Sequence, residues 1–432
     1  MNAIKTINVG LMGLGVVGGG VATTLQGESD AIHSKAGLPI RLKKILVRDG
    51  AKARDAAVSK DLLTTDPEEI LADDDIQVVV EVMGGSRPAT DYLKRALTSG
   101  KHVVTANKEV MAQSGPELLQ LSEKLGVNLL FEASVAGGIP IVGCLMNQLL
   151  ANDIVSIRGI INGTTNYILT QMAQKHSSFD QALGEAQQLG YAEPDPTNDV
   201  DGIDAGFKLA ILSSLAYHHR VSPDDIYRQG ITSLEAKDFQ HAAELGYAIK
   251  SLAIATLEGD TIQARLYPAL VPLDNMLAKV DGVFNAVEVD GSLCGQVLFH
   301  GRGAGREPTT SAVVGDVIEA ARRIGSQAPP AARVRHQRAL SIKPIDDLES
   351  RYYLRLTVAD RPGVLAQISR IFGDGGISLA SVLQKDSDPA EQTAELVITT
   401  HQAREASVQS ALVRVSGLEV VLRINNLLRI ET

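Results

Sequence analysis

The chain has 432 residues, of which 44% are apolar and 21% are charged, and its formal net charge is −10 at pH 7. This length exceeds one ordinary hydrophobic core and predicts two or three domains, and no low-complexity run interrupts the globular composition. The acidic balance, without a basic cluster that carries interleaved aromatic residues, argues against a nucleic-acid partner. No apolar run reaches the roughly 20 residues that a membrane span needs.

Residues 6–26 join an apolar strand to a helical pattern through the spacing Gly13-x-Gly15-x-x-Gly18. In such a unit the first glycine permits a tight turn, and the second lets the backbone approach a pyrophosphate. The third allows close packing of helix on strand, and the helix N-terminus faces the anion. A glycine-rich turn also ends ordinary strands, so this spacing alone does not establish a nicotinamide-type cofactor. The segments that follow provide the further evidence. The candidate cofactor-binding residues are Gly13, Leu14, Gly15, Val16, Val17 and Gly18.

A second strand is expected over residues 40–47, and Arg48 and Asp49 follow it where the ribose of a dinucleotide is bound. An acid at this point favours the ribose hydroxyls of NAD. Arg48, assisted by Lys52 and Arg54, favours the additional phosphate of NADP. We expect NADP, or use of both cofactors.

Strands and helices continue to alternate after this point, which predicts a doubly wound parallel sheet of the Rossmann type. Ligands of such a sheet collect at the carboxyl ends of the strands, so the loop Thr-Ala-Asn-Lys at residues 105–108 is a candidate. Lys108 is either a solvated lysine at the start of a helix or a site residue. The expected strands are 75–83, 101–105 and 127–131, and the expected helices are 87–97 and 116–125.

A second candidate loop, EASVAGGIP at residues 132–140, is rich in small residues and begins with Glu132. Such a loop can present several main-chain carbonyls to one point. It suits a hard cation such as sodium or a polar substrate, and equally an ordinary turn that leads into a helix.

The chain then becomes strongly acidic. A strand over residues 154–161 leads into Asn162, and helices are expected over 167–175 and 179–189. Two prolines stiffen the loop that follows. This segment has five carboxylates in a stretch of 12 residues: Glu193, Asp195, Asp199, Asp201 and Asp204.

Asp204 and Lys208 are four residues apart in a helix expected to run to about residue 217, so they share one helix face. As a surface ion pair they would contribute only about 0.2–0.5 kcal/mol. Apolar residues surround them nearly on all sides, which indicates a buried helix in which a lysine needs a partner and is suited to proton transfer. We therefore favour a catalytic pair.

The alternating patterns in residues 252–299 predict antiparallel strands, and a sheet of this kind often forms a subunit contact, so a homodimer or homotetramer is expected. A helix over residues 307–324 should pack back on the nucleotide domain. The segment 326–350, with paired prolines at 329 and 330, is expected to be a linker. After it the pattern is βαββαβ, a ferredoxin-like order, over 352–359, 364–372, 377–383, 394–400, 404–415 and 418–424.

The two cysteines, Cys144 and Cys294, stand in apolar surroundings without histidine or cysteine at metal-binding spacing. This predicts small buried side chains rather than a disulfide framework or a zinc site. The N-terminal apolar run is broken by glycines and has no obvious cleavage site, so we expect a cytoplasmic enzyme.

The order of several motifs resembles the homoserine dehydrogenase family over residues 6–325, and the 23-residue acidic segment is not a general feature of dehydrogenases. The resemblance implies the NAD(P)-dependent interconversion of L-homoserine and L-aspartate 4-semialdehyde, in threonine, methionine and isoleucine biosynthesis. The motifs are GLGVVG (13–18), TANK (105–108), FEASVAGGIP (131–140), INGTTNYI (161–168), GYAEPDPTNDVDGIDAGFKLAIL (190–212) and GRGAGREPTTSAVVGD (301–316).

The resemblance also implies roles for individual residues. Lys208 would transfer the proton, Asp204 would orient it, and Lys108 would be a second active-site lysine near substrate and nicotinamide. Glu193 and Asp199 would bind the substrate's amino group and its surroundings, and Gly305 would return to the cofactor. A sodium site would comprise Glu132 and the main-chain oxygens of Val135, Gly137 and Ile139.

The implied domains are a nucleotide-binding domain at 1–132, completed by the helix 306–325, and an α+β catalytic and oligomerisation domain at 133–305. Residues 351–432 resemble an ACT domain, whose usual signature matches DRPGVLAQISRIF at 360–372. This resemblance implies threonine as an end-product inhibitor, bound near Gly363 and at paired interfaces. The alternative is a module that only dimerises.

Two other classes of protein have to be weighed. Another semialdehyde or hydroxy-acid oxidoreductase is possible, but an acylating semialdehyde dehydrogenase needs an activated thiolate, and neither cysteine has an activating neighbour. A non-catalytic sensor of nucleotide and amino acid would have no use for Lys108 and Lys208.

Overall fold

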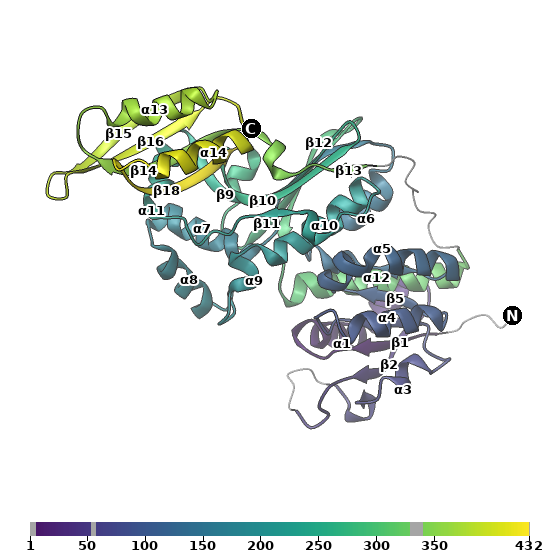
Figure 1. The fold of residues 1–432 in the computed structure, drawn as a ribbon. Helices are drawn as coiled ribbons and strands as arrows, with labels where there is room; N and C mark the ends of the chain where they lie inside the picture. The colour runs from purple at the N-terminus through teal and green to yellow at the C-terminus, as the bar shows by residue number, and fades with distance from the viewer. Residues whose placement is uncertain (1–5, 53–57, 329–339, 432) are drawn as a thin grey trace. The chain divides into compact units, whose positions relative to one another are not determined.

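A computed structural model describes residues 6–52, 58–328 and 340–431 (Figure 1). The chain forms two compact units. Unit 1 comprises Met1–Val155, Phe207–Pro223 and Ala286–Ala339, and unit 2 comprises Ser156–Gly206, Asp224–Asn285 and Leu340–Thr432. Among the described residues, no helix has both the length and the apolar character that crossing a membrane requires.

Unit 1 contains the doubly wound parallel sheet that the sequence predicts, with strand order β3-β2-β1-β4-β5-β6. The order reverses between β1 and β4, which places the carboxyl ends of these two strands at the switch point where such sheets bind ligands. The strands are β1 (Ile7–Met12), β2 (Ile40–Leu46), β3 (Leu63–Thr64), β4 (Val78–Glu81), β5 (His102–Thr105) and β6 (Leu129–Leu130).

Helices α1 (Val16–Gly27), α2 (Ser29–Ala36) and α12 (Arg306–Ser326) pack on one face of this sheet and share a buried core with β1, β2 and β4. Helix α3 (Glu68–Leu71) belongs to the other face, because a Cβ added to Gly10 of β1 would lie 2.5 Å from Ile70. Helix α12, from far along the chain, thus packs on the same face of the sheet as α1.

Helix α4 (Ala89–Thr98) lies near its predicted position, but α5 (Lys108–Leu125) begins eight residues before the predicted start. Asn107 caps it by accepting the N–H of Val110, and Pro116 lies inside the helix instead of opening it. Lys108 is therefore the first residue of a helix and not part of a loop.

The prediction that both cysteines are buried is wrong. Cys294 is exposed, in the turn between β11 (Phe284–Gly291) and β12 (Gly295–Arg302). The side chains of such a tight turn point into solvent. Cys144 is half-buried, at the start of a π-helical turn after α6 (Ile141–Gly143), and burial raises the pKa of its thiol. Both thiols are free.

Unit 2 is built on a sheet with strand order β7-β9-β10-β18-β14-β16-β15. Strands β9 and β10 form the antiparallel hairpin that the sequence predicts, whereas β10 and β18 are parallel, with Leu270 opposite Ile430. Two short strands, β8 (Tyr227–Arg228) and β13 (Ser341–Ile342), pair with β10, and β17 (Ala403–Arg404) pairs with β14. The main strands are β7 (Ile154–Ile160), β9 (Tyr247–Glu258), β10 (Thr261–Pro272), β14 (Glu349–Ala359), β15 (Leu379–Asp388), β16 (Thr393–Thr400) and β18 (Val421–Ile430).

The C-terminal part of unit 2 has the predicted βαββαβ order, with α13 (Val364–Asp374) and α14 (Glu405–Ser416) packed on one face of its strands. Its strand order, β18-β14-β16-β15, is that of a ferredoxin-like module. The remaining helices of the unit are α7 (Gly163–Lys175), α8 (Phe179–Gln188), α9 (Thr197–Val200), α10 (Ile203–Ala216), which continues into unit 1, and α11 (Ala236–Glu244).

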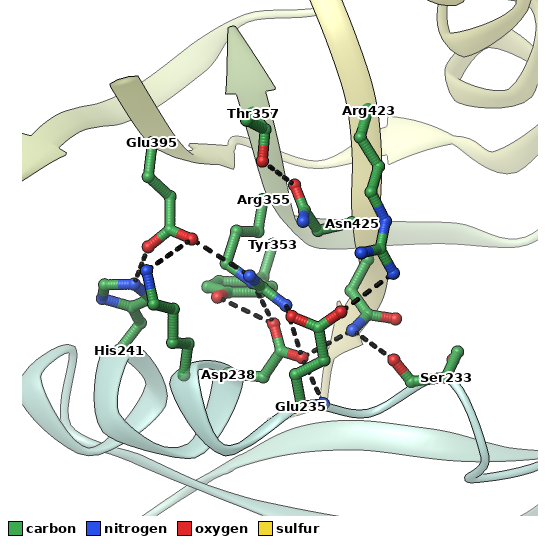
Figure 2. Close-up of polar contacts among 12 residues, drawn as sticks. Ser233, Glu235, Asp238, His241, Tyr353, Arg355, Thr357, Glu395, Arg423 and Asn425 are labelled. Carbon is green, nitrogen blue, oxygen red and sulfur yellow. Dashed lines mark hydrogen bonds and ion pairs between the residues drawn. The ribbon is translucent and has the colours of Figure 1, made fainter. Parts of the chain in front are cut away.

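A cluster of buried charges fastens this module to α11 (Figure 2). The Arg355 guanidinium donates from Nε to Asp238 Oδ1 at 2.7 Å, and its Nη1 and Nη2 reach Glu395 and Glu235 at 3.0 and 2.7 Å. His241 lies 2.8 Å from Glu395. We call these five residues the Arg355 cluster. Because one cation satisfies carboxylates from both parts, the module is docked on α11 and not merely tethered to it.

Candidate active site

The glycine turn of unit 1 has the backbone that a dinucleotide site requires. Gly13 adopts a φ of +103°, and a Cβ there would lie 2.9 Å from the carbonyl oxygen of Val82. A Cβ on Gly18 would lie 2.1 Å from the carbonyl oxygen of Gly13, whereas the space around Gly15 is open. Gly15 is the N-cap of α1, and Val16 is 71% exposed. A pyrophosphate can therefore approach the first turn of α1 directly.

The predicted ribose-binding residues follow β2. Arg48 is exposed, and the carboxylate of Asp49 accepts the N–H of Ala51 at 2.8 Å in a tight turn. Lys52 is also exposed, and Arg54 lies outside the described residues. Part of the hydrogen-bonding capacity of Asp49 is thus used by its own turn.

The loop at residues 132–140 is organised around the Glu132 carboxylate. Its two oxygens accept the N–H groups of Val142 and Gly143 at 2.9 and 2.6 Å, and burial raises the pKa of Glu132. Ala136 and Gly137 adopt positive φ values of 53° and 45°, so the backbone bends sharply between the predicted sodium ligands Val135 and Ile139.

Two features of α12 lie beside these loops. Gly305, with a φ of +115°, is the N-cap of the helix, and Asp316 accepts the N–H of Glu132 at 2.9 Å. Burial raises the pKa of Asp316 to about 8, and the neighbouring charge of Glu132 adds to the increase, while the N–H of Glu132 opposes it.

In unit 2 the side-chain amide of one asparagine binds two carboxylates of the acidic segment. Asn162, at the end of β7, donates from Nδ2 to Asp199 Oδ1 at 2.7 Å and to Asp204 Oδ2 at 2.9 Å. Its Oδ1 accepts the N–H of Thr165 and thereby caps α7. Asp199 and Asp204 are thus brought together, as neighbours of a common donor.

Glu193 is exposed, in a loop whose backbone is fixed by its neighbours. Gln187 donates to the carbonyl oxygens of Glu193 and Pro194, and Thr164 donates to that of Tyr191. The structure therefore holds the loop in place but does not bring the Glu193 carboxylate to the Asn162 amide.

Helix α10 carries Asp204 and Lys208 one turn apart. Asp204 is 5% exposed and Lys208 is 8% exposed, which agrees with the buried helix that the apolar pattern indicates. In the part of the chain that the structure describes, no group of three or more His, Cys, Asp or Glu side chains is placed to hold a metal ion.

Two functional candidates were missed by the sequence analysis. Asn162 has no role in the sequence-based prediction, although it is a polar residue at a strand end before a glycine and two threonines. Glu81 is likewise absent from the predicted site, although it is the single charge in the apolar run VVVEVM. It is fully buried at the end of β4 and accepts hydrogen bonds from Thr105 and Asn107.

Three features together are typical of a nicotinamide-dependent oxidoreductase. They are a glycine turn suited to a dinucleotide, a buried carboxylate and lysine on one helix, and a C-terminal ferredoxin-like module. Family models agree with this class. Residues 13–132 match the homoserine dehydrogenase NAD-binding domain, residues 140–318 match homoserine dehydrogenase, and residues 352–418 match the ACT domain.

Homoserine dehydrogenase of Neisseria gonorrhoeae is 42% identical over 436 residues, covering 99% of both chains. The crystal structure of a homoserine dehydrogenase from Thiobacillus denitrificans superposes with a TM-score of 0.92 at 41% identity, over 100% of this chain and 99% of that one. A hyperthermophilic archaeal homoserine dehydrogenase in complex with NADPH is 28% identical, with a TM-score of 0.62, over 73% of this chain and 97% of that one.

The chain belongs to the homoserine dehydrogenase family. It is an oxidoreductase with an NAD(P)-binding domain and a C-terminal ACT domain, so the predicted fold class and family are confirmed.

Proposed function

We propose that Lys208 and Asp204 carry out the proton transfer when this homoserine dehydrogenase interconverts L-homoserine and L-aspartate 4-semialdehyde. The nicotinamide ring, when bound, supplies or accepts the hydride. The Lys208 ammonium donates a proton to the developing alkoxide during aldehyde reduction, and the neutral amine accepts the hydroxyl proton during oxidation. The observation that carries this proposal is the burial of both side chains one turn apart in α10.

Asp204 would orient Lys208, and its own position is fixed by Asn162. The amide donates to one oxygen of Asp204 and to Asp199, so the two carboxylates keep a defined separation. Asp199 and Glu193 would receive the ammonium group of the substrate. Lys108, the first residue of α5, would be the second active-site lysine.

An initial-rate assay of the purified chain with L-homoserine and either NAD or NADP tests the function directly. We expect cofactor reduction that depends on homoserine and reverses with aspartate 4-semialdehyde. Absence of turnover with both cofactors would contradict the proposal.

For the cofactor we propose a preference for NADP, which the archaeal relative bound to NADPH supports. Arg48 is exposed at the end of β2, whereas Asp49 is partly engaged in its own turn. Replacing Arg48 with alanine should weaken NADP binding about 10–100-fold, since a charge-assisted hydrogen bond contributes about 1.5–3 kcal/mol. The dissociation constant of NAD, measured by titration of the cofactor-free protein, should change less than about twofold. Equal weakening of both cofactors would contradict a role in phosphate recognition.

We further propose that the loop at residues 132–140 binds sodium. Main-chain carbonyls and a carboxylate are hard oxygen ligands, and the Glu132 carboxylate has lone pairs beyond those that accept the N–H groups of Val142 and Gly143. Sodium chloride should raise the melting temperature above that in choline chloride at equal ionic strength, and Glu132→Gln should abolish the difference. Equal melting temperatures in the two salts would exclude the site.

The ACT domain would bind threonine as an end-product inhibitor, and the sheet of unit 2 would contribute to a homodimer or homotetramer. Rates measured with and without threonine, together with the sedimentation mass in each condition, separate an effector site from a module that only dimerises. The domain division given above and a cytoplasmic location remain predictions.

A further inference from the structure

We propose that Glu81 is a positioning residue for Lys108: its buried carboxyl group fixes the end of β5 and the N-terminus of α5, and so sets the backbone position of that lysine. The inference rests on the active-site role proposed for Lys108. All residues involved belong to unit 1.

Glu81 stands at the central point of the sheet edge where ligands bind. It is the last residue of β4, paired with Met12 of β1 on one side and with Thr105 of β5 on the other. Gly13 and the glycine turn follow Met12, and Asn107 and Lys108 follow Thr105. A side chain at this register position adjoins both candidate segments.

A continuous set of hydrogen bonds leads from this carboxyl group to α5. Thr105 donates from Oγ1 to Glu81 Oε2 at 2.6 Å, and it accepts the backbone N–H of Asn107 at 3.0 Å. Asn107 donates from Nδ2 to Glu81 Oε1 at 3.4 Å and to the carbonyl oxygen of Gly85 at 2.8 Å. Its Oδ1 then caps α5 through the N–H of Val110 at 3.1 Å.

The same carboxyl group also binds the backbone that follows β4. Oε1 of Glu81 accepts the N–H of Met83 at 2.8 Å, at the start of the segment that leads to Gly84 and Gly85. One side chain thus connects the chain after β4 with the N-terminus of α5, and Lys108 is the first residue of that helix.

A buried carboxyl group destabilises the fold through its desolvation, so a purely structural link at this position would not favour one. Glu81 is 0% exposed, and burial raises its pKa, while the hydrogen bonds from Thr105, Met83 and Asn107 oppose the increase. Within the described ranges no Lys, Arg or His forms an ion pair with it. Buried carboxyl groups without a cationic partner are concentrated at functional sites, because their desolvation destabilises the fold.

The test is a double-mutant cycle with Glu81→Gln and Lys108→Ala. If Glu81 acts by positioning Lys108, Glu81→Gln alone should lower kcat about tenfold, because the reaction rate falls steeply when a catalytic group is misplaced. In the Lys108→Ala background the same change should lower kcat less than about twofold. Thr105→Val, which removes one link of the same hydrogen-bond chain, should behave like Glu81→Gln and serves if that variant folds poorly.

Two measurements without turnover accompany the cycle. Hydrogen exchange of the cofactor-free protein should be faster in Glu81→Gln for peptides that cover residues 105–112 and unchanged in β1 and β2. Lys101→Met is the matched control: Lys101 is buried at the opposite end of β5 and donates to the carbonyl oxygens of Asp73 and Ile76. It should lower the melting temperature without changing kcat or exchange at residues 105–112.

Two outcomes would overturn the inference and can be told apart. Full activity of Lys108→Ala would remove the role proposed for Lys108 itself. A loss of activity in Lys108→Ala, with a further tenfold loss when Glu81→Gln is added, would show that Glu81 acts by another route.

Discussion

Asn162 links a helix cap to two carboxylates with a single side chain. Its Oδ1 accepts the N–H of Thr165 at 2.8 Å, and its Nδ2 group reaches Asp199 and Asp204. Two nearby carboxylates repel one another, and a shared donor offsets that repulsion. The residue therefore affects the stability of α7 and the geometry of the acidic site, and these effects can be separated.

Replacing Asn162 with serine or aspartate keeps an N-cap oxygen but removes the amide donors. We expect both variants to lower kcat/KM for homoserine at least about tenfold, since charged groups lose hydrogen bonds of about 1.5–3 kcal/mol. Aspartate should be the more damaging, because it adds a third negative charge. Melting temperatures and steady-state rates measure the two effects. Normal kcat/KM in the serine variant would contradict the bridging role.

Asp316 should make stability depend on pH. Its pKa in the folded protein is raised to about 8 from the ordinary 3.8, so the folded state holds the proton more tightly than the unfolded state. Its contribution to stability is therefore fully present below about pH 4 and is lost as pH rises to about 8.

Asp316→Asn keeps the acceptor for the N–H of Glu132 but cannot ionise. Its melting temperature relative to the wild type should increase with pH, reaching a gain of about 2–4 °C near pH 8 for each kcal/mol relieved. Asp316 keeps some contact with solvent, which screens its charge, so we expect more than about 1 kcal/mol but less than the roughly 5 kcal/mol that the full pKa shift corresponds to. A difference that does not vary between pH 4 and pH 8 would contradict the assignment.

Sequence separation decides which site residues could be predicted. The glycine turn and the pair Asp204 and Lys208 are defined by spacings of a few residues, which a helix or turn converts directly into geometry. Asn162 acts on partners 37 and 42 residues away, and Asp316 accepts from Glu132 across 184 residues. No local pattern encodes such contacts.

At the scale of the elements, the helix starts were the least predictable feature. Both α5 and α7 begin earlier than expected, and in both an asparagine just before the helix accepts an N–H of the first turn. Asparagine is a strong N-cap, so the signal was present at Asn107 and Asn162. A start at Pro116, as expected from the sequence, is compatible with the preference of proline for the first turn of a helix, but α5 begins eight residues earlier and contains this proline.

The Arg355 cluster is the element-scale feature with the clearest energetic consequence. Arg355→Met would leave Asp238 and Glu395 buried without their cation, so we expect the free energy of unfolding to fall by about 3–5 kcal/mol. Arg423→Met is the matched control, because Arg423 is exposed and donates to Glu235 at the edge of the cluster; it should cost about 0–1 kcal/mol. Urea unfolding measures both. Equal effects of the two substitutions would contradict the docking role of the cluster.

At the scale of the whole molecule, the ACT module and the β9–β10 hairpin share one sheet. The sequence predicted the βαββαβ order and the antiparallel hairpin, because each follows from alternation and turns within a segment. The parallel pairing of β10 with β18 joins Ala269 to Arg429 and was not anticipated. Such pairing depends on which strand edges remain open after the local elements form, and this is not visible in either segment alone.

The proton-transfer role of Lys208 is tested most directly by comparing Lys208→Ala with Lys175→Ala, a control at an exposed lysine that pairs with Glu185. We predict that Lys208→Ala lowers kcat by about 10²–10⁴-fold, while the dissociation constant of the cofactor changes less than about twofold. Lys175→Ala should retain the wild-type kcat. If Lys208→Ala turns over homoserine at the wild-type rate, the mechanism proposed for this chain is wrong.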